Sequence, residues 1–206
     1  MELSITYSLE FERHRVKETV QNIDWYRTHQ YKPYFPGGLH VDNITGYPME
    51  EIMKMLEQEF NEKIYIEAKR DLEEKAAKYL APFAEKLIPL GLPLHERYRV
   101  TLTRFGVGGS YFLPDTVILN FTGKFGIGTI NTVMHEIVHL STEALILENA
   151  VGHWEKERIV DLIMSKVGPF SKPIMQYIPT EYVEKVDPVF EKLFPDIRAI
   201  IEEVGG

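Results

Sequence analysis

A long apolar segment in the second half of the chain carries three ionisable side chains within five residues. Residues 129–150 follow the spacing of a helix, and the only charged residue between Thr132 and Leu140 is Glu136. A helix this apolar is expected to be buried, and buried histidine and glutamate side chains require hydrogen-bonding or charged partners. The segment His135-Glu136-Ile137-Val138-His139 must therefore belong to an interior site or to a core with satisfied polar groups.

The two histidines of this segment are four residues apart, which places them on one face of a helix with Cβ atoms about 5–6 Å apart. Both imidazole rings can then reach one metal ion. Glu136 is turned about 100° from His135 around the helix, so it faces a water on the metal rather than the metal itself. This HExxH arrangement is typical of zinc sites in which the glutamate is the general base. The alternative is a core helix with two hydrogen-bonded histidines.

Composition limits the chemistry further. The chain has 206 residues and no cysteine, which excludes disulfides, thiolate zinc sites, iron–sulfur clusters and a cysteine nucleophile. Any metal must therefore be bound by histidine and carboxylate. The 31 acidic residues against 23 basic ones give a net charge of -8, so a nucleic-acid partner is not expected.

Export signals, membrane segments and a nucleotide-binding loop are not predicted. The first eight residues lack the basic and apolar regions of a signal peptide, and no run approaches 18 consecutive apolar residues. We therefore expect a cytoplasmic protein with no membrane partner. Gly106, Gly108 and Gly109 resemble a phosphate loop, but no Gly-Lys-Ser/Thr sequence follows them.

The hydrophobic pattern predicts a single α+β domain over residues 1–206, in which a small mixed sheet is backed by a long helix and by the HExxH helix. A catalytic core is expected over about 61–168. It would lie between an N-terminal part, 1–47, of undetermined role and a helical C-terminal part, 169–206, that closes the cleft. The expected elements are strands near 3–9, 98–105 and 116–121, and helices over 48–60, 61–87, 129–150 and 153–167.

A catalytic zinc takes three protein ligands and leaves the fourth position to water, so one ligand must come from outside the HExxH helix. The next predicted helix follows after a short turn and supplies Glu155, Glu157 and Asp161. Glu155 and Glu157 are turned about 200° from each other around that helix, so only one of them can coordinate the metal. The residues alone leave both as alternatives.

His135-Glu136-x-x-His139 followed by Glu157-x-x-x-Asp161 resembles the gluzincin group of zinc metallopeptidases, which includes the thermolysin-like enzymes and the zinc aminopeptidases. The resemblance covers roughly residues 98–165 and implies a zincin-like fold. It also implies that Glu157 is the third zinc ligand and that Asp161 orients a ligating histidine. The chain departs from the group at Lys156, where the group has asparagine, and in a slightly shorter spacing, which keeps Glu155 as the alternative ligand.

The implied function is a Zn²⁺-dependent metallopeptidase that hydrolyses a peptide or protein substrate. Glu136 would accept a proton from a zinc-acidified water, and the hydroxide would attack the peptide carbonyl. An oxyanion-stabilising side chain is also needed. A non-catalytic, zinc-stabilised binding module and a regulatory peptidase for one intracellular protein are the alternative functions. The oxyanion candidates are Tyr177, to which we assign the role, Tyr182 and His153, whereas His14, His29, His40 and His95 have no ligand spacing and are expected at the surface.

Overall fold

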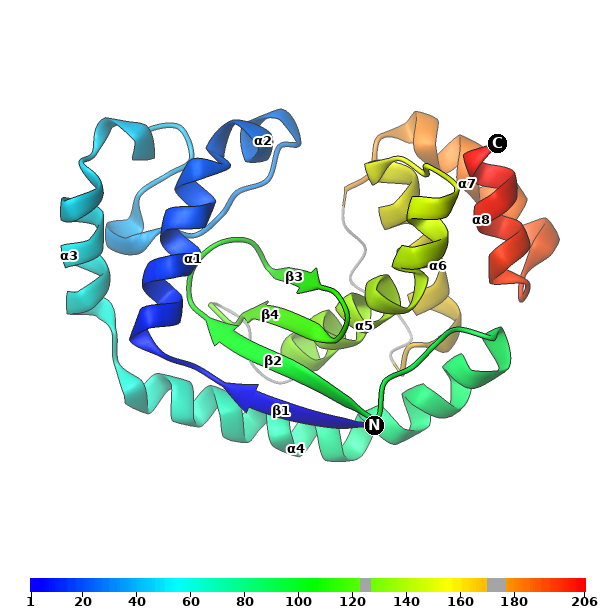
Figure 1. Ribbon diagram of the computed structural model, residues 1–206, viewed down its shortest axis with the longest axis horizontal. Helices are drawn as coiled ribbons and strands as arrows, with labels where there is room; N and C mark the ends of the chain where they lie inside the picture. The colour runs from blue at the N-terminus through cyan, green and yellow to red at the C-terminus, as the bar shows by residue number, and fades with distance from the viewer. Residues whose placement is uncertain (123–126, 170–176) are drawn as a thin grey trace.

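The structure, a computed structural model, describes residues 1–122, 127–169 and 177–206. Helices pack on one face and at both ends of a small four-stranded sheet (Figure 1), so the predicted α+β class is confirmed. The strands are β1 (Glu2–Thr6), β2 (Arg97–Thr103), β3 (Gly109–Phe112) and β4 (Thr116–Asn120). The helices are α1 (Leu9–Gln21), α2 (Ile23–Thr28), α3 (Met49–Glu59), α4 (Glu62–Leu87), α5 (Ile127–Glu148), α6 (His153–Val167), α7 (Thr180–Leu193) and α8 (Ile197–Gly205).

The sheet is mixed, as expected, with the strand order β1-β2-β4-β3. The β1–β2 and β2–β4 pairs are parallel, whereas β3 pairs antiparallel with β4 and forms one edge of the sheet. Three strands lie close to their predicted positions. The sequence did not predict β3, because this short edge strand begins at Gly109, in a glycine-rich stretch that indicates a turn.

One face of the sheet is covered by α4 and α5 (Figure 1). The long helix α4 contacts β1 and β2, and α5 contacts β4 and β3. Alternation along β2 buries Tyr98, Val100 and Leu102, whereas Arg99 between them is exposed. The HExxH helix therefore runs beside the β3 edge, which is what places its functional residues next to that strand.

The described residues form two apolar clusters in the interior. The larger one joins the sheet to α4, α5, α6 and the C-terminal helices, and the smaller one joins α1 and α3 to the loop around Ile44. Buried Glu12 of α1 links them, because its carboxylate accepts hydrogen bonds from the Tyr65 and Thr103 hydroxyls and from the Arg104 N–H. Burial raises the pKa of Glu12, and these hydrogen bonds offset only part of that effect. The N-terminal helices are thus tied to the sheet through a specific polar contact.

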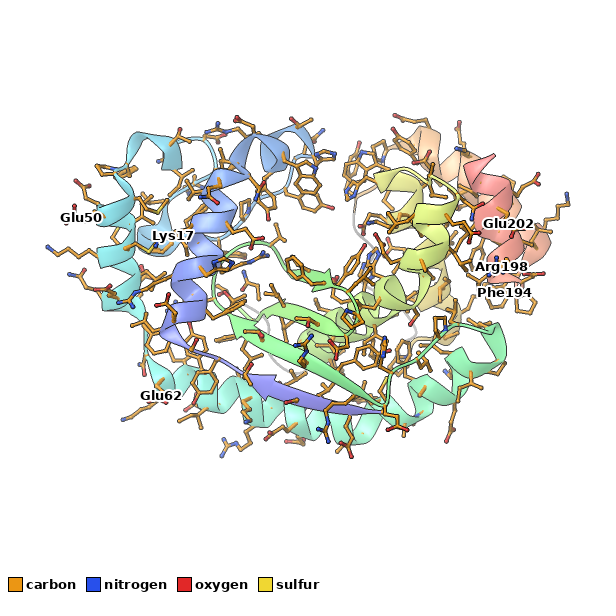
Figure 2. All side chains as sticks on the ribbon, in the orientation of Figure 1. Lys17, Glu50, Glu62, Phe194, Arg198 and Glu202 are labelled. Atoms are coloured by element: carbon orange, nitrogen blue, oxygen red, sulfur yellow. The ribbon has the colours of Figure 1, made fainter. Side chains whose placement is uncertain are left out.

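The helices α1–α3 and α6–α8 form two groups at opposite ends of the sheet, and β3 lies between them (Figure 1). Charged side chains point outward from both groups, for example Lys17 and Glu50 at one end and Arg198 and Glu202 at the other (Figure 2). Within the described part of the chain, no helix combines the length and apolarity needed to cross a membrane.

Candidate metal centre

The structure brings His135 and His139 of α5 together with Glu157 of α6. The two Nε2 atoms are 3.1 Å apart, and Glu157 Oε2 lies 3.6 Å from His135 Nε2 and 3.3 Å from His139 Nε2. The three side chains come together because α6 packs back against α5 after the short turn at Val151. His139 and Glu157 are buried, and the His135 side chain is 16% exposed.

These distances fit one tetrahedral zinc ion. Ligands about 2.0–2.1 Å from zinc at tetrahedral angles lie about 3.3–3.4 Å from one another, and the three observed separations scatter around that value. Two imidazole nitrogens and one carboxylate oxygen are also a donor set that zinc accepts. Among the described residues, the His and carboxylate atoms that cluster within 4.8 Å of one another belong to these three side chains. A zinc ion held by these three side chains would leave its fourth coordination position to solvent or substrate.

The electrostatics of the group favour positive charge between its carboxylates and its imidazole rings. Burial alone would raise the pKa of Glu157, but the two histidines hold it well below the ordinary value, so the carboxylate is charged. Burial would lower the pKa of His135, but the contact with Glu157 and the charges of Glu136, Glu157 and Asp161 outweigh it and raise that pKa. The buried carboxylates thus favour positive charge at the ring nitrogens. A metal cation would supply such a charge.

Asp161 lies one turn after Glu157, and its Oδ1 atom is 3.6 Å from His135 Nδ1. The side chain is 2% exposed. A ligating histidine usually directs its second ring nitrogen to a carboxylate, which fixes the ring and raises its basicity. Asp161 occupies that position for His135.

Glu155, the alternative ligand, points elsewhere. Its Oε1 atom is 3.2 Å from Lys185 Nζ of α7. This placement follows from the helical geometry, because Glu155 and Glu157 lie on opposite sides of α6. The geometry therefore selects Glu157 over Glu155 as the residue beside the histidines.

Glu136 is buried beside the ligands, where β3 passes over α5. A Cβ atom at Gly109 would overlap the Glu136 carboxylate and lie 2.7 Å from the Thr132 methyl group. Glycine at this position therefore allows the strand to approach the helix closely. Glu136 faces the same cleft as the three ligand side chains without belonging to their cluster.

The site opens into a cleft of about 470 Å³ between α5, α6, β3 and the N-terminal segment around α2. Three large aromatic side chains of the lining, Trp25, Tyr26 and Tyr31, come from the N-terminal part, to which the sequence assigned no role. The described residues that line the cleft are Trp25, Tyr26, Tyr31, Val107, Gly108, Gly109, Ser110, Tyr111, Gly128, Asn131, Thr132, His135, Glu136, His139, His153, Lys156, Glu157 and Asp161.

Tyr31 is the most informative of the residues that the sequence did not predict. Its hydroxyl is 3.1 Å from Nε2 of His153, and its ring stacks between Trp25 and Trp154, at centroid distances of 5.5 and 6.3 Å. His153 Nδ1 in turn lies 3.9 Å from Glu157 Oε1. The N-terminal segment therefore reaches the candidate ligand Glu157 through Tyr31 and His153. No spacing rule joins Tyr31 to residues more than 100 positions away, so only the fold reveals this contact.

The three oxyanion candidates differ in position. His153 lines the cleft, whereas Tyr177 is 76% exposed and Tyr182 is half-buried on α7, and neither tyrosine is among the described residues of the cleft lining. His29 is half-buried and stacks on Trp25 at a centroid distance of 4.3 Å, so the expectation of an ordinary surface residue is wrong for it. The expectation is right for His14, His40 and His95, which are exposed.

Comparison with known proteins adds no relative. No protein-family model matches the chain, and searches of curated proteins and of solved structures find no match either. The resemblance to the gluzincins therefore rests on the sequence motif of this chain.

Proposed function

We propose that this protein is a zinc-dependent metallopeptidase whose metal ligands are His135, His139 and Glu157. The observation that carries the proposal is the spacing of the three ligand atoms, 3.1 to 3.6 Å apart, in a cleft that Glu136 also lines. A structural zinc site is usually closed by a fourth protein ligand, and the described cluster contains three. An open position facing a cleft supports catalysis over the zinc-stabilised binding module.

Glu136 is the general base in this proposal. Zinc, when bound, polarises the peptide carbonyl and lowers the pKa of a water molecule. The Glu136 carboxylate accepts a proton from that water, and the same group can return it to the leaving amine. Gly109 matters here because its missing side chain leaves room for the carboxylate against the strand.

The Tyr31 hydroxyl stabilises the developing oxyanion, in place of Tyr177, and His153 orients that hydroxyl. Burial and the charges of Glu157 and Glu136 raise the pKa of Tyr31, so its hydroxyl remains a hydrogen-bond donor. Burial lowers the pKa of His153, so its ring is neutral at pH 7. In the tautomer that carries the proton on Nε2, His153 donates to the Tyr31 oxygen and leaves the Tyr31 proton for the substrate.

The substrate is proposed to be a peptide lying along β3. Among the residues that the structure describes, this strand pairs with β4 alone, and Gly109, Ser110 and Tyr111 line the cleft. An edge strand offers unpaired backbone groups to which an extended peptide can add as a further strand.

The test is hydrolysis of a mixed peptide library by zinc-loaded protein, with Glu136→Gln as the matched variant. The glutamine keeps the size and hydrogen bonding of the side chain but cannot accept a proton. We expect about a 10²–10⁴-fold loss of turnover with an unchanged zinc content. Failure of the zinc-loaded protein to cleave any peptide, or full activity of Glu136→Gln, would contradict the proposal.

A further inference from the structure

The two histidine ligands are held in place by different means. His135 has the Asp161 carboxylate beside its Nδ1 atom, at 3.6 Å. The Nδ1 atom of His139 is buried, and within the described residues it has no hydrogen-bond partner. The ring of His139 lies instead against the ring of Tyr111 on β3, with centroids 4.9 Å apart and planes 10° from parallel. An offset stack of this kind is favourable and restricts rotation of both rings.

Tyr111 is itself anchored at its hydroxyl. The hydroxyl donates to Glu143 Oε2 at 2.6 Å, and Lys156 Nζ donates to the Tyr111 oxygen at 2.7 Å. Lys156 Nζ also lies 3.7 Å from Glu143 Oε2, so the chain of contacts joins opposite charges. The Lys156 and Glu143 side chains are 17% and 13% exposed, which limits the screening of these contacts by water.

These anchors come from the two helices that carry the metal ligands. Glu143 lies one turn after His139 on α5, and Lys156 immediately precedes Glu157 on α6. Lys156 is also the residue at which the sequence departs from the gluzincin pattern. The network therefore ties β3 to both ligand-bearing helices at one point, next to His139.

The register of β3 over α5 explains why this strand can serve the site. Alternate residues of a strand face the same side; Gly109 packs on Glu136, and two residues later Tyr111 packs on His139. Ser110, between them, faces the other way and accepts a hydrogen bond of 2.9 Å from the buried guanidinium of Arg15. One side of β3 is thus hydrogen-bonded to Arg15 of α1. Its other side, which faces α5, contacts the proposed general base Glu136 and the proposed ligand His139.

We propose that Tyr111 is a positioning residue for His139, holding the imidazole ring by stacking in the orientation that binds the metal, with Glu143 and Lys156 fixing the tyrosine. The inference rests on the proposed metal centre. Without the stack, the His139 ring gains rotational freedom that metal binding must remove. The expected cost is about that of losing a hydrogen-bonding partner of a ligand, 10–100-fold in zinc affinity.

The experiment measures zinc affinity by competition with a chelator, together with the visible absorption spectrum of the cobalt-substituted protein, for the wild type, Tyr111→Leu and Tyr111→Phe. Tyr111→Leu should lower zinc affinity about 10–100-fold and alter the cobalt spectrum. Tyr111→Phe keeps the stack and should stay closer to the wild type. Tyr177→Leu is the matched control, since that tyrosine is largely exposed, and should behave as the wild type.

The outcomes separate this inference from the proposed function. If the wild type binds no zinc, the metal centre itself is wrong. If the wild type binds zinc and Tyr111→Leu does so with equal affinity and an unchanged cobalt spectrum, only the positioning role is overturned. Should Tyr111→Leu fail to fold without metal, Glu143→Leu and Lys156→Met decide instead, because they keep the tyrosine ring and remove the two side chains that hydrogen-bond its hydroxyl. Lower zinc affinity in these variants supports the proposal, and wild-type affinity in both overturns it.

Discussion

The cleft has two halves of different chemistry. The helical half, formed by α5 and α6, contains imidazoles and carboxylates, with the candidate ligands and Asp161 on facing helices. The opposite half, formed by β3 and the segment from Trp25 to Tyr31, contains aromatic rings and glycine. In the proposed function, the first half binds the cation and the second half offers hydrogen-bond donors to the substrate. Metal binding and turnover should therefore respond to different substitutions.

The largest effect on turnover without an effect on zinc affinity is expected for Tyr31→Phe, in the opposite half. Removing the hydroxyl takes away the proposed oxyanion donor but leaves the ring between Trp25 and Trp154. Loss of one such donor lowers kcat about 10²–10³-fold, or about 2.7–4 kcal/mol of transition-state stabilisation. Steady-state kinetics and a zinc titration on the same sample check this, and zinc affinity should not change.

Tyr177→Phe is the matched control, because Tyr177 is the tyrosine that the sequence favoured and it lies mostly in solvent. It should keep wild-type turnover. A loss of activity in Tyr177→Phe with none in Tyr31→Phe would return the oxyanion role to Tyr177 and remove the opposite half from catalysis.

A smaller effect, on binding instead of turnover, is expected for Asp161→Ala in the helical half. His135 would lose the carboxylate beside its Nδ1 atom, and zinc affinity should fall about 10–100-fold. Competition with a chelator measures the change. If the zinc affinity of Asp161→Ala equalled that of the wild type, His135 would not depend on Asp161, and the helical half would be less tightly organised than its geometry indicates.

The helical half could be predicted from the sequence because its residues are local. His135 and His139 share one helical face, and a short turn returns α6 so that Glu157 and Asp161 meet that face. The α+β class followed in the same way from the alternation in β2 and the apolar pattern of α5. Spacing alone could not choose between Glu155 and Glu157, and the pairing of Glu155 with Lys185 depends on how α7 packs.

The opposite half could not be predicted because its contacts join distant parts of the chain. Tyr31 meets His153 only after the N-terminal helices pack against the sheet, an arrangement to which the buried Glu12 contributes. The strand β3 carries glycine at its first position, which weakens the strand signal. That same glycine permits the close approach to Glu136, so the residue that obscured the strand is the one that the site requires.

The central claim is that His135, His139 and Glu157 bind one zinc ion, and metal analysis of three proteins tests it most directly. After loading with zinc and removal of excess metal, the wild type and Glu155→Ala should each retain about one zinc per chain, whereas Glu157→Ala should retain little. Glu155 serves as the control because it lies two residues away on the same helix and pairs with Lys185. Zinc retained by Glu157→Ala and lost from Glu155→Ala, or no zinc in the wild type, would contradict the account.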